Sequence, residues 1–134
     1  MASAGYSGTP LPKKLEIKEN TRVATVGAPR DFADTLGTLP AGARLIRGVS
    51  APHDLTIWFI TSRRQLEGDI GKIAPARGEG SLWIAWPKKA SGVKTDVTED
   101  VLRDVILPLG LVDRKVCAID ATWSGLLFSW RKQA

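Results

Sequence analysis

The chain has 134 residues, of which 43% are hydrophobic and 25% charged, a composition that fits one folded domain. Its single cysteine excludes an internal disulfide, and no apolar run approaches the roughly 20 residues of a membrane span, so we expect a cytoplasmic protein without membrane contact. The net charge of +5 permits an anionic partner, nucleic acid included, but no recognised nucleic-acid-binding module accompanies the charge.

Residues 1–20 predict an N-terminal arm. Small and turn-forming residues, GYSGTP at 5–10, precede a mixed-charge segment, KKLEIKEN at 13–20. We expect this arm to lead into a short helical or irregular segment and to dock on the body of the domain, the alternative being a disordered terminus. Tyr6, the only tyrosine of the chain, is a candidate partner contact in the arm.

Three strands are predicted before residue 62. The segment 21–26, TRVATV, is the first; Gly27 ends it, and Asp31 is a candidate cap for a short helix. The segment 43–48, ARLIRG, alternates like an edge strand. The segment 54–61, DLTIWFIT, is apolar and β-branched, which is typical of a central strand.

Two helices are predicted from their capping residues. Ser62 and Gln65 form a capping box ahead of apolar residues at helical spacing, and Pro75 ends that helix. Thr98 begins the last helix, which Gly110 follows.

The segment 81–87, SLWIAWP, predicts a strand buried on both faces. Pro87 lacks the N–H that a strand ladder needs, so the strand is expected to end there. Trp83 and Trp86 are three residues apart and should therefore face opposite sides of the sheet.

The segments 115–120 and 126–130 predict an antiparallel hairpin, because only ATWSG connects them. Trp123 then lies in the turn, exposed to a partner or to the arm. The alternation of strands and helices predicts the α/β class, with a single Rossmann-like domain over 21–134: a three-layer sandwich around a mainly parallel sheet of about six strands that ends in the antiparallel hairpin.

This order of elements resembles the core of class I S-adenosylmethionine-dependent methyltransferases. The resemblance implies a truncated methyltransferase-like topology, in which 43–48, 54–61 and 81–87 match the second, fourth and fifth strands and the third is missing. The cofactor motifs depart from the family pattern: the turn VGAPRDF has one glycine, and Arg47 stands where an acidic residue would hold the ribose hydroxyls. We therefore expect no cofactor, with S-adenosylmethionine as the alternative.

Six short motifs resemble a family of small bacterial proteins, the domain of unknown function 3052. The resemblance implies a bacterial, standalone domain and supplies no activity. The motifs are GYSGTPL at 5–11, TSR at 61–63, AWPKKASG at 85–92, TED at 98–100, KVCAID at 115–120 and TWSGL at 122–126.

Basic residues follow three of the predicted strands. Because the carboxyl ends of parallel strands meet at one edge of a sheet, we expect one basic rim that binds a small anionic ligand or an acidic protein partner. Two helix starts at this edge would add backbone N–H donors. The alternative is that the serines only cap turns and the lysines only solvate the edge. The candidate ligand-binding residues are Arg30, Ser62, Arg63, Lys88, Lys89 and Ser91.

Catalytic groups are scarce. His53, the only histidine, precedes a strand and so lies at the edge opposite the basic rim, and Cys117 stands in an apolar segment that predicts burial. One histidine and one cysteine cannot build the usual metal sites. We expect a non-catalytic binding domain; the alternatives are an atypical methyltransferase and a regulatory protein-interaction module that uses the arm and Trp123.

Overall fold

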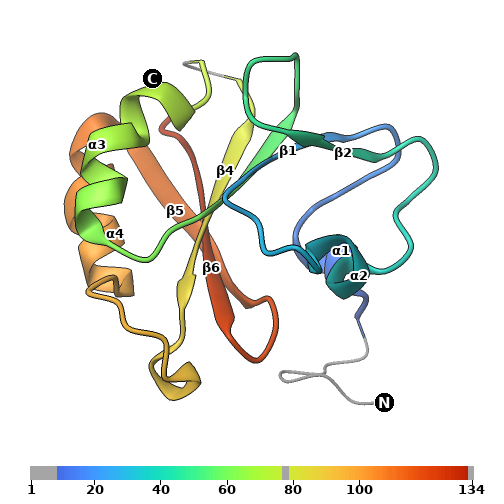
Figure 1. Cartoon of the computed structure of the whole chain (residues 1–134). Coiled ribbons are helices and arrows are strands. Elements are labelled where there is room, and N and C mark those ends of the chain that lie inside the picture. Colours follow the sequence, from blue (N-terminus) through green and yellow to red (C-terminus); the bar gives the residue numbers. More distant parts are fainter. Residues whose placement is uncertain (1–8, 77–78, 133–134) are drawn as a thin grey trace.

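A six-stranded mixed sheet runs through the centre of the domain (Figure 1). The computed structural model describes residues 9–76 and 79–132. The strands lie in the order β2-β1-β3-β4-β6-β5; the first four are parallel, and β6 runs antiparallel to both of its neighbours, β4 and β5. The strands are β1 (Arg22–Val26), β2 (Arg44–Arg47), β3 (Leu55–Phe59), β4 (Ser81–Pro87), β5 (Leu111–Ala118) and β6 (Trp123–Trp130).

Helices cover both faces of this sheet. The short helices α1 (Leu11–Lys14) and α2 (Phe32–Leu36) lie on one side, which we call the α1/α2 face, and α3 (Arg63–Ile73) and α4 (Glu99–Ile106) lie on the other, the α3/α4 face (Figure 1). The chain also forms two 3₁₀ turns, η1 (Lys89–Ser91) after β4 and η2 (Leu107–Leu109) after α4. The prediction of a Rossmann-like sandwich with a truncated methyltransferase-like topology is confirmed.

The truncation lies between β2 and β3. The connection over residues 48–54 contains no helix or strand, although it crosses β1 to reach the far side of that strand. Val49 packs at the border of the α3/α4 core, so the crossover passes over that face. A loop therefore replaces the helical layer that usually covers such a crossover.

The caps of the two long helices are those the sequence predicted. Ser62 Oγ accepts a hydrogen bond from the backbone N–H of Gln65 at 3.1 Å, and Thr98 Oγ1 accepts one from Val101 at 3.2 Å. Asp31 precedes α2 as predicted, but its side chain does not cap the helix. The backbone of Asp31 is not in the extended conformation of a side-chain cap, and only its carbonyl oxygen accepts hydrogen bonds from α2, from the Thr35 backbone N–H and hydroxyl.

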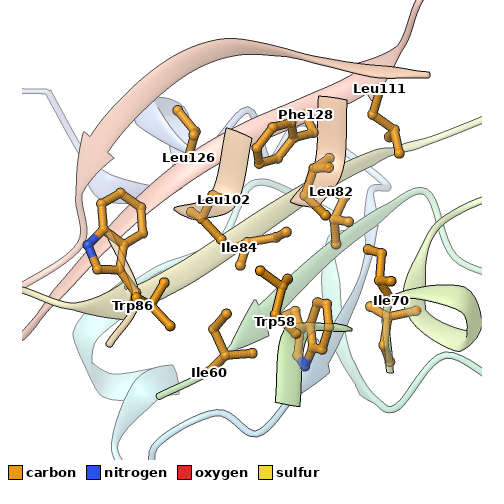
Figure 2. Close-up of a cluster of buried hydrophobic side chains, with 14 residues drawn as sticks. Trp58, Ile60, Ile70, Leu82, Ile84, Trp86, Leu102, Leu111, Leu126 and Phe128 are labelled. Atoms are coloured by element: carbon orange, nitrogen blue, oxygen red, sulfur yellow. The ribbon is translucent and has the colours of Figure 1, made fainter. Parts of the chain in front are cut away.

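The core on the α3/α4 face is built from alternate residues of the central strands (Figure 2). Trp58 on β3 is 1% exposed and packs with helix residues such as Ile70 and Leu102. Trp86 belongs to this cluster, whereas Trp83 belongs to the cluster on the α1/α2 face, so the prediction of opposite faces is confirmed.

The segment after α1 packs into the α1/α2 core. Leu15 and Ile17 are 0% and 2% exposed, and the buried indole N–H of Trp83 donates to the Leu15 carbonyl oxygen at 2.9 Å. An ion pair adds to this attachment, since Arg114 on β5 contacts Glu16 at 2.9 Å and lowers the pKa of that carboxyl group. Residues 11–17 are thus held against β4 and β5.

The hairpin is longer than the sequence predicted. β5 begins at Leu111 and β6 at Trp123, so only residues 119–122 connect them. Trp123 therefore does not lie in the turn: it pairs with Pro87 of β4, is half-buried, and packs edge-to-face on Phe59 with ring centroids 5.1 Å apart. The prediction of an exposed turn residue is wrong, because Asp120 Oδ1 accepts the Thr122 and Trp123 N–H groups and closes the turn earlier.

The indole bond of Trp83 gives a test of how the arm is held. Trp83→Phe removes the N–H and leaves the buried Leu15 carbonyl without its partner, so we expect the free energy of unfolding in urea to fall by about 1–3 kcal/mol more than for Trp86→Phe. Trp86→Phe is the matched control, because Trp86 is also buried and its indole makes no hydrogen bond within the described residues. Equal losses would mean that packing alone holds residues 11–17.

Candidate functional site

The predicted basic rim is not one cluster, and Arg63 shows why. Its guanidinium pairs with Glu67 one turn along α3 at 2.9 Å, which raises the pKa of Arg63. Its backbone N–H donates to Asp96 Oδ1 at 2.8 Å. A carboxylate of the chain itself therefore occupies the start of α3, where an external anion was expected.

The two predicted serines hold local turns. Ser62 Oγ is engaged as the cap of α3. Ser91 Oγ donates to the Lys88 carbonyl oxygen at 2.6 Å and accepts from the Val93 N–H at 3.1 Å. Both hydroxyl groups thus stabilise the backbone next to them.

Lys88 and Lys89 do not line the same pocket. Lys88 is near enough to Cys117, on the α1/α2 face, to act on the thiol electrostatically. Lys89 lines a pocket on the opposite face, beside the start of α4. Of the two lysines, only Lys89 lines this pocket.

The pocket beside Lys89 has a cavity volume of about 810 Å³ and carries both signs of charge. We call it the Trp86 pocket, after the indole in its lining. Its lining also contains Glu99 and Asp100, and both of these carboxylates pair with Arg103. Such a mixed wall offers no strong preference for an anion.

A second pocket at the carboxyl ends of β1 and β2 is purely basic. We call it the Arg30/Arg47 pocket; its cavity volume is about 540 Å³. Both guanidinium groups are exposed, and neither has an ion-pair partner in the part of the chain that the structure describes. No described lining residue is acidic. The lining is Thr25, Gly27, Ala28, Pro29, Arg30, Phe32, Ala33, Leu45, Ile46 and Arg47.

Local structure places the two arginines together. Leu45 and Arg47 alternate on β2 with Ile46, so both face the α1/α2 side, where Leu45 packs against the core. Arg30 lies in the loop between β1 and α2, which Phe32 anchors at 3% exposure by packing on Phe59. From the sequence, Arg47 stood out only as a departure from the methyltransferase pattern; the two-residue period of the edge strand was the signal that could have placed it beside Arg30.

Gly27, at the end of β1, is required by the backbone opposite it. Its φ of +69° is in the left-handed region, and a Cβ atom there would lie 2.8 Å from the Phe59 carbonyl oxygen at the end of β3. In the methyltransferase pattern, glycine in this turn lets the cofactor approach. Here the close packing of two strand ends already accounts for it.

The expected catalytic candidates lie away from this edge. His53 borders a pocket at the amino ends of the strands, as predicted. Burial raises the pKa of the Cys117 thiol, and Lys14, Lys115 and Lys88 only partly oppose the rise, so the thiol stays protonated near neutral pH. Among residues 9–76 and 79–132, no group of three or more His, Cys, Asp or Glu side chains could hold a metal ion, and no helix is long and apolar enough to cross a membrane.

The structure describes only one of the two predicted partner contacts, Tyr6 and Trp123. Tyr6 lies outside the described residues. Trp123 is committed to Phe59 and to its strand neighbours.

Several solved structures share this fold. One is a SAM-dependent methyltransferase from Aquifex aeolicus, with a TM-score of 0.56 and 12% identity. The match covers 87% of this chain and 85% of the methyltransferase. Another is a putative type 11 methyltransferase from Sulfolobus solfataricus, with a TM-score of 0.55 and 11% identity. That match covers 92% of this chain and 90% of the methyltransferase. A third is MtNAS in complex with MTA and tNA, with a TM-score of 0.56 and 10% identity. That match covers 90% of this chain, but this chain spans only 57% of MtNAS. Identity this low establishes the fold alone.

No protein-family profile and no curated protein matches the sequence. The resemblance to the domain of unknown function 3052 therefore stays a prediction.

Gly27 offers a test of the turn that borders the Arg30/Arg47 pocket. In Gly27→Ala, the alanine must adopt a left-handed φ and its Cβ atom clashes with the Phe59 carbonyl oxygen. In Gly92→Ala, the alanine must adopt a left-handed φ of +78°, but nothing lies within 4 Å of its Cβ atom. We expect Gly27→Ala to lower the melting temperature clearly more than Gly92→Ala, since the second variant carries only the conformational cost of roughly 1 kcal/mol. A Gly27→Ala protein as stable as Gly92→Ala would show that β1 and β3 can separate freely at this edge.

Proposed function

We propose that the domain binds a small phosphorylated molecule in the Arg30/Arg47 pocket. The observation that carries the proposal is the pair of arginines without carboxylate partners at the carboxyl edge of the sheet. Among the other basic groups predicted for this edge, Arg63 is paired with Glu67, Lys89 borders a pocket of mixed charge, and Lys88 lines neither this pocket nor the Trp86 pocket. The site is thus narrower than the rim expected from the sequence, and it includes Arg47.

The chemistry of the pocket favours a phosphate ester over a bare inorganic ion. Guanidinium groups bind phosphate oxygens through paired N–H donors, and charge-assisted bonds of this kind contribute about 1.5–3 kcal/mol each. The half-buried apolar side chain of Leu45 lies in the same lining and would contact the organic part of the ligand. Nothing in this description requires a reacting group, so binding without catalysis is the function proposed.

Calorimetric titration with adenosine 5′-monophosphate and with inorganic phosphate tests the proposal. We expect the nucleotide to bind more tightly than phosphate, and the Arg30→Ala/Arg47→Ala double variant to bind the nucleotide at least tenfold more weakly. Arg44→Ala is the matched control: Arg44 is an exposed arginine on the same short strand that does not line the pocket.

A second double variant locates the site. Lys88→Ala/Lys89→Ala removes the same amount of charge and is expected to leave nucleotide binding within about twofold, since screening weakens distant surface charges. Loss of binding in the lysine variant alone would place the site at Lys88 and Lys89. No heat with any protein and either ligand would remove the proposal.

An atypical methyltransferase is the second candidate, and the shared fold favours it. S-adenosylmethionine is the cofactor that this candidate requires. Arg47 stands where the family pattern expects a carboxylate for the ribose hydroxyls, so the residues present fit that cofactor poorly at this point. The single glycine of the turn, Gly27, is already accounted for by Phe59.

Titration with S-adenosylmethionine separates the two candidates. We expect no heat from the wild-type protein at millimolar cofactor, and weak binding to appear in Arg47→Glu, because a carboxylate can accept the ribose hydroxyls where a guanidinium cannot. Micromolar binding to the wild-type protein would favour the methyltransferase.

A further inference from the structure

A separate pocket lies at the opposite edge, at the amino ends of β1, β3 and β4 on the α3/α4 face. Its cavity volume of about 850 Å³ is within the range of small-molecule sites. The walls are the helix-free crossover at 48–54, the end of α3 and the residues that lead into β4. The hollow follows from the truncated topology, because no helix covers the sheet between the crossover and α3.

The floor of this pocket contains an unsatisfied hydroxyl group. Thr56 on β3 is 0% exposed, and its Oγ1 is a buried side-chain oxygen with no hydrogen-bond partner in the described structure. Leaving a buried hydroxyl unpaired costs about 1–3 kcal/mol. Thr25, on the neighbouring strand, offers a contrast, since its hydroxyl donates to the Ile46 carbonyl oxygen. We name the hollow the Thr56 pocket.

Fixed polar groups stand on one wall. Asp54 accepts from the backbone and guanidinium of Arg22 at 2.8–3.1 Å, which lowers the pKa of Asp54 and holds both charges in place. His53 Nδ1 is 2.8 Å from the Ala51 carbonyl oxygen, which can only accept, so Nδ1 carries the proton and Nε2 remains an acceptor in the neutral ring.

The described part of the rim is balanced in charge. Lys72, from the last turn of α3, and Glu79 stand on the far wall and are exposed, without ion-pair partners in the described residues. Together with Arg22 and Asp54 they give two positive and two negative groups among the described lining residues. A purely anionic or purely cationic ligand would be repelled by as many of these groups as attract it. A molecule with one positive and one negative charge can place each charge beside a group of the opposite sign.

We propose that the Thr56 pocket binds a free α-amino acid as its zwitterion. Lys72 and Glu79 provide opposite charges for the carboxylate and ammonium groups, and the Thr56 hydroxyl provides a donor and an acceptor at the floor. The hydroxyl is covered in this structure, so ligand contact needs a small shift of the wall side chains. This inference is independent of the Arg30/Arg47 pocket, which lies at the other edge of the sheet.

Melting curves with pools of the common L-amino acids at millimolar concentration test the inference. We expect at least one pool to raise the melting temperature of the wild-type protein, while acetate and ethylamine, which carry only one of the two charges, do not. Thr56→Val should be more stable than wild type without ligand, because it removes the unpaired hydroxyl and keeps the shape. It should also lose most of the amino-acid effect.

Further variants keep the test decisive. Lys72→Ala should abolish the amino-acid effect with little change in basal stability, and Thr25→Val, whose hydroxyl is already bonded, should destabilise and leave the effect intact. The inference is overturned if no pool shifts the melting temperature, if acetate or ethylamine acts as strongly as the amino acids, or if Thr56→Val is less stable than wild type. It is equally overturned if Thr56→Val retains the full effect.

Discussion

Trp83 is the contact on which most of the α1/α2 side depends. It lies at the centre of β4, fully buried, and bonds through its indole N–H to the carbonyl oxygen of Leu15, 68 residues earlier in the chain. Its ring packs over Gly125 of the adjacent strand β6, where a Cβ atom would lie 3.1 Å from the ring. One side chain therefore joins the N-terminal segment, the last parallel strand and the antiparallel hairpin, and buried aromatic area of this size contributes strongly to stability.

The absence of a helix between β2 and β3 leaves part of the sheet uncovered, whereas Trp83 closes the α1/α2 side. Without a helix on the crossover, the α3/α4 face is less covered near the amino ends of β1 and β3, where the Thr56 pocket lies. The Arg30/Arg47 pocket lies on the α1/α2 face, so the missing layer does not account for it. The two hollows differ in charge: the carboxyl-edge pocket carries only arginines, and the amino-edge pocket carries balanced charges. A truncated fold can thus keep the ligand-binding edge of a Rossmann-like sheet and acquire a second concave surface.

Charge pairing decides which of the basic residues remain available to a ligand. Arg63, Arg103 and Arg114 are each neutralised by carboxylates of the chain. Arg30 and Arg47 are not paired within the described residues, and they are the two that line an acid-free pocket. The net positive charge of the chain is therefore less informative about a binding site than the coincidence of unpaired arginines with an acid-free pocket lining.

The sequence by itself determined the order of the elements, the capped helices at Ser62 and Thr98, the buried strand ending at Pro87 and the opposite faces of Trp83 and Trp86, because each depends on local periodicity or backbone chemistry. It could not determine which cations meet. Asp96 accepts from the backbone N–H of Arg63, Glu16 pairs with Arg114 on β5, and Arg47 joins Arg30 in one pocket across two strands. These outcomes depend on contacts between distant segments. Only the tertiary structure decided them, since strand register and crossover path bring together residues that the chain keeps apart.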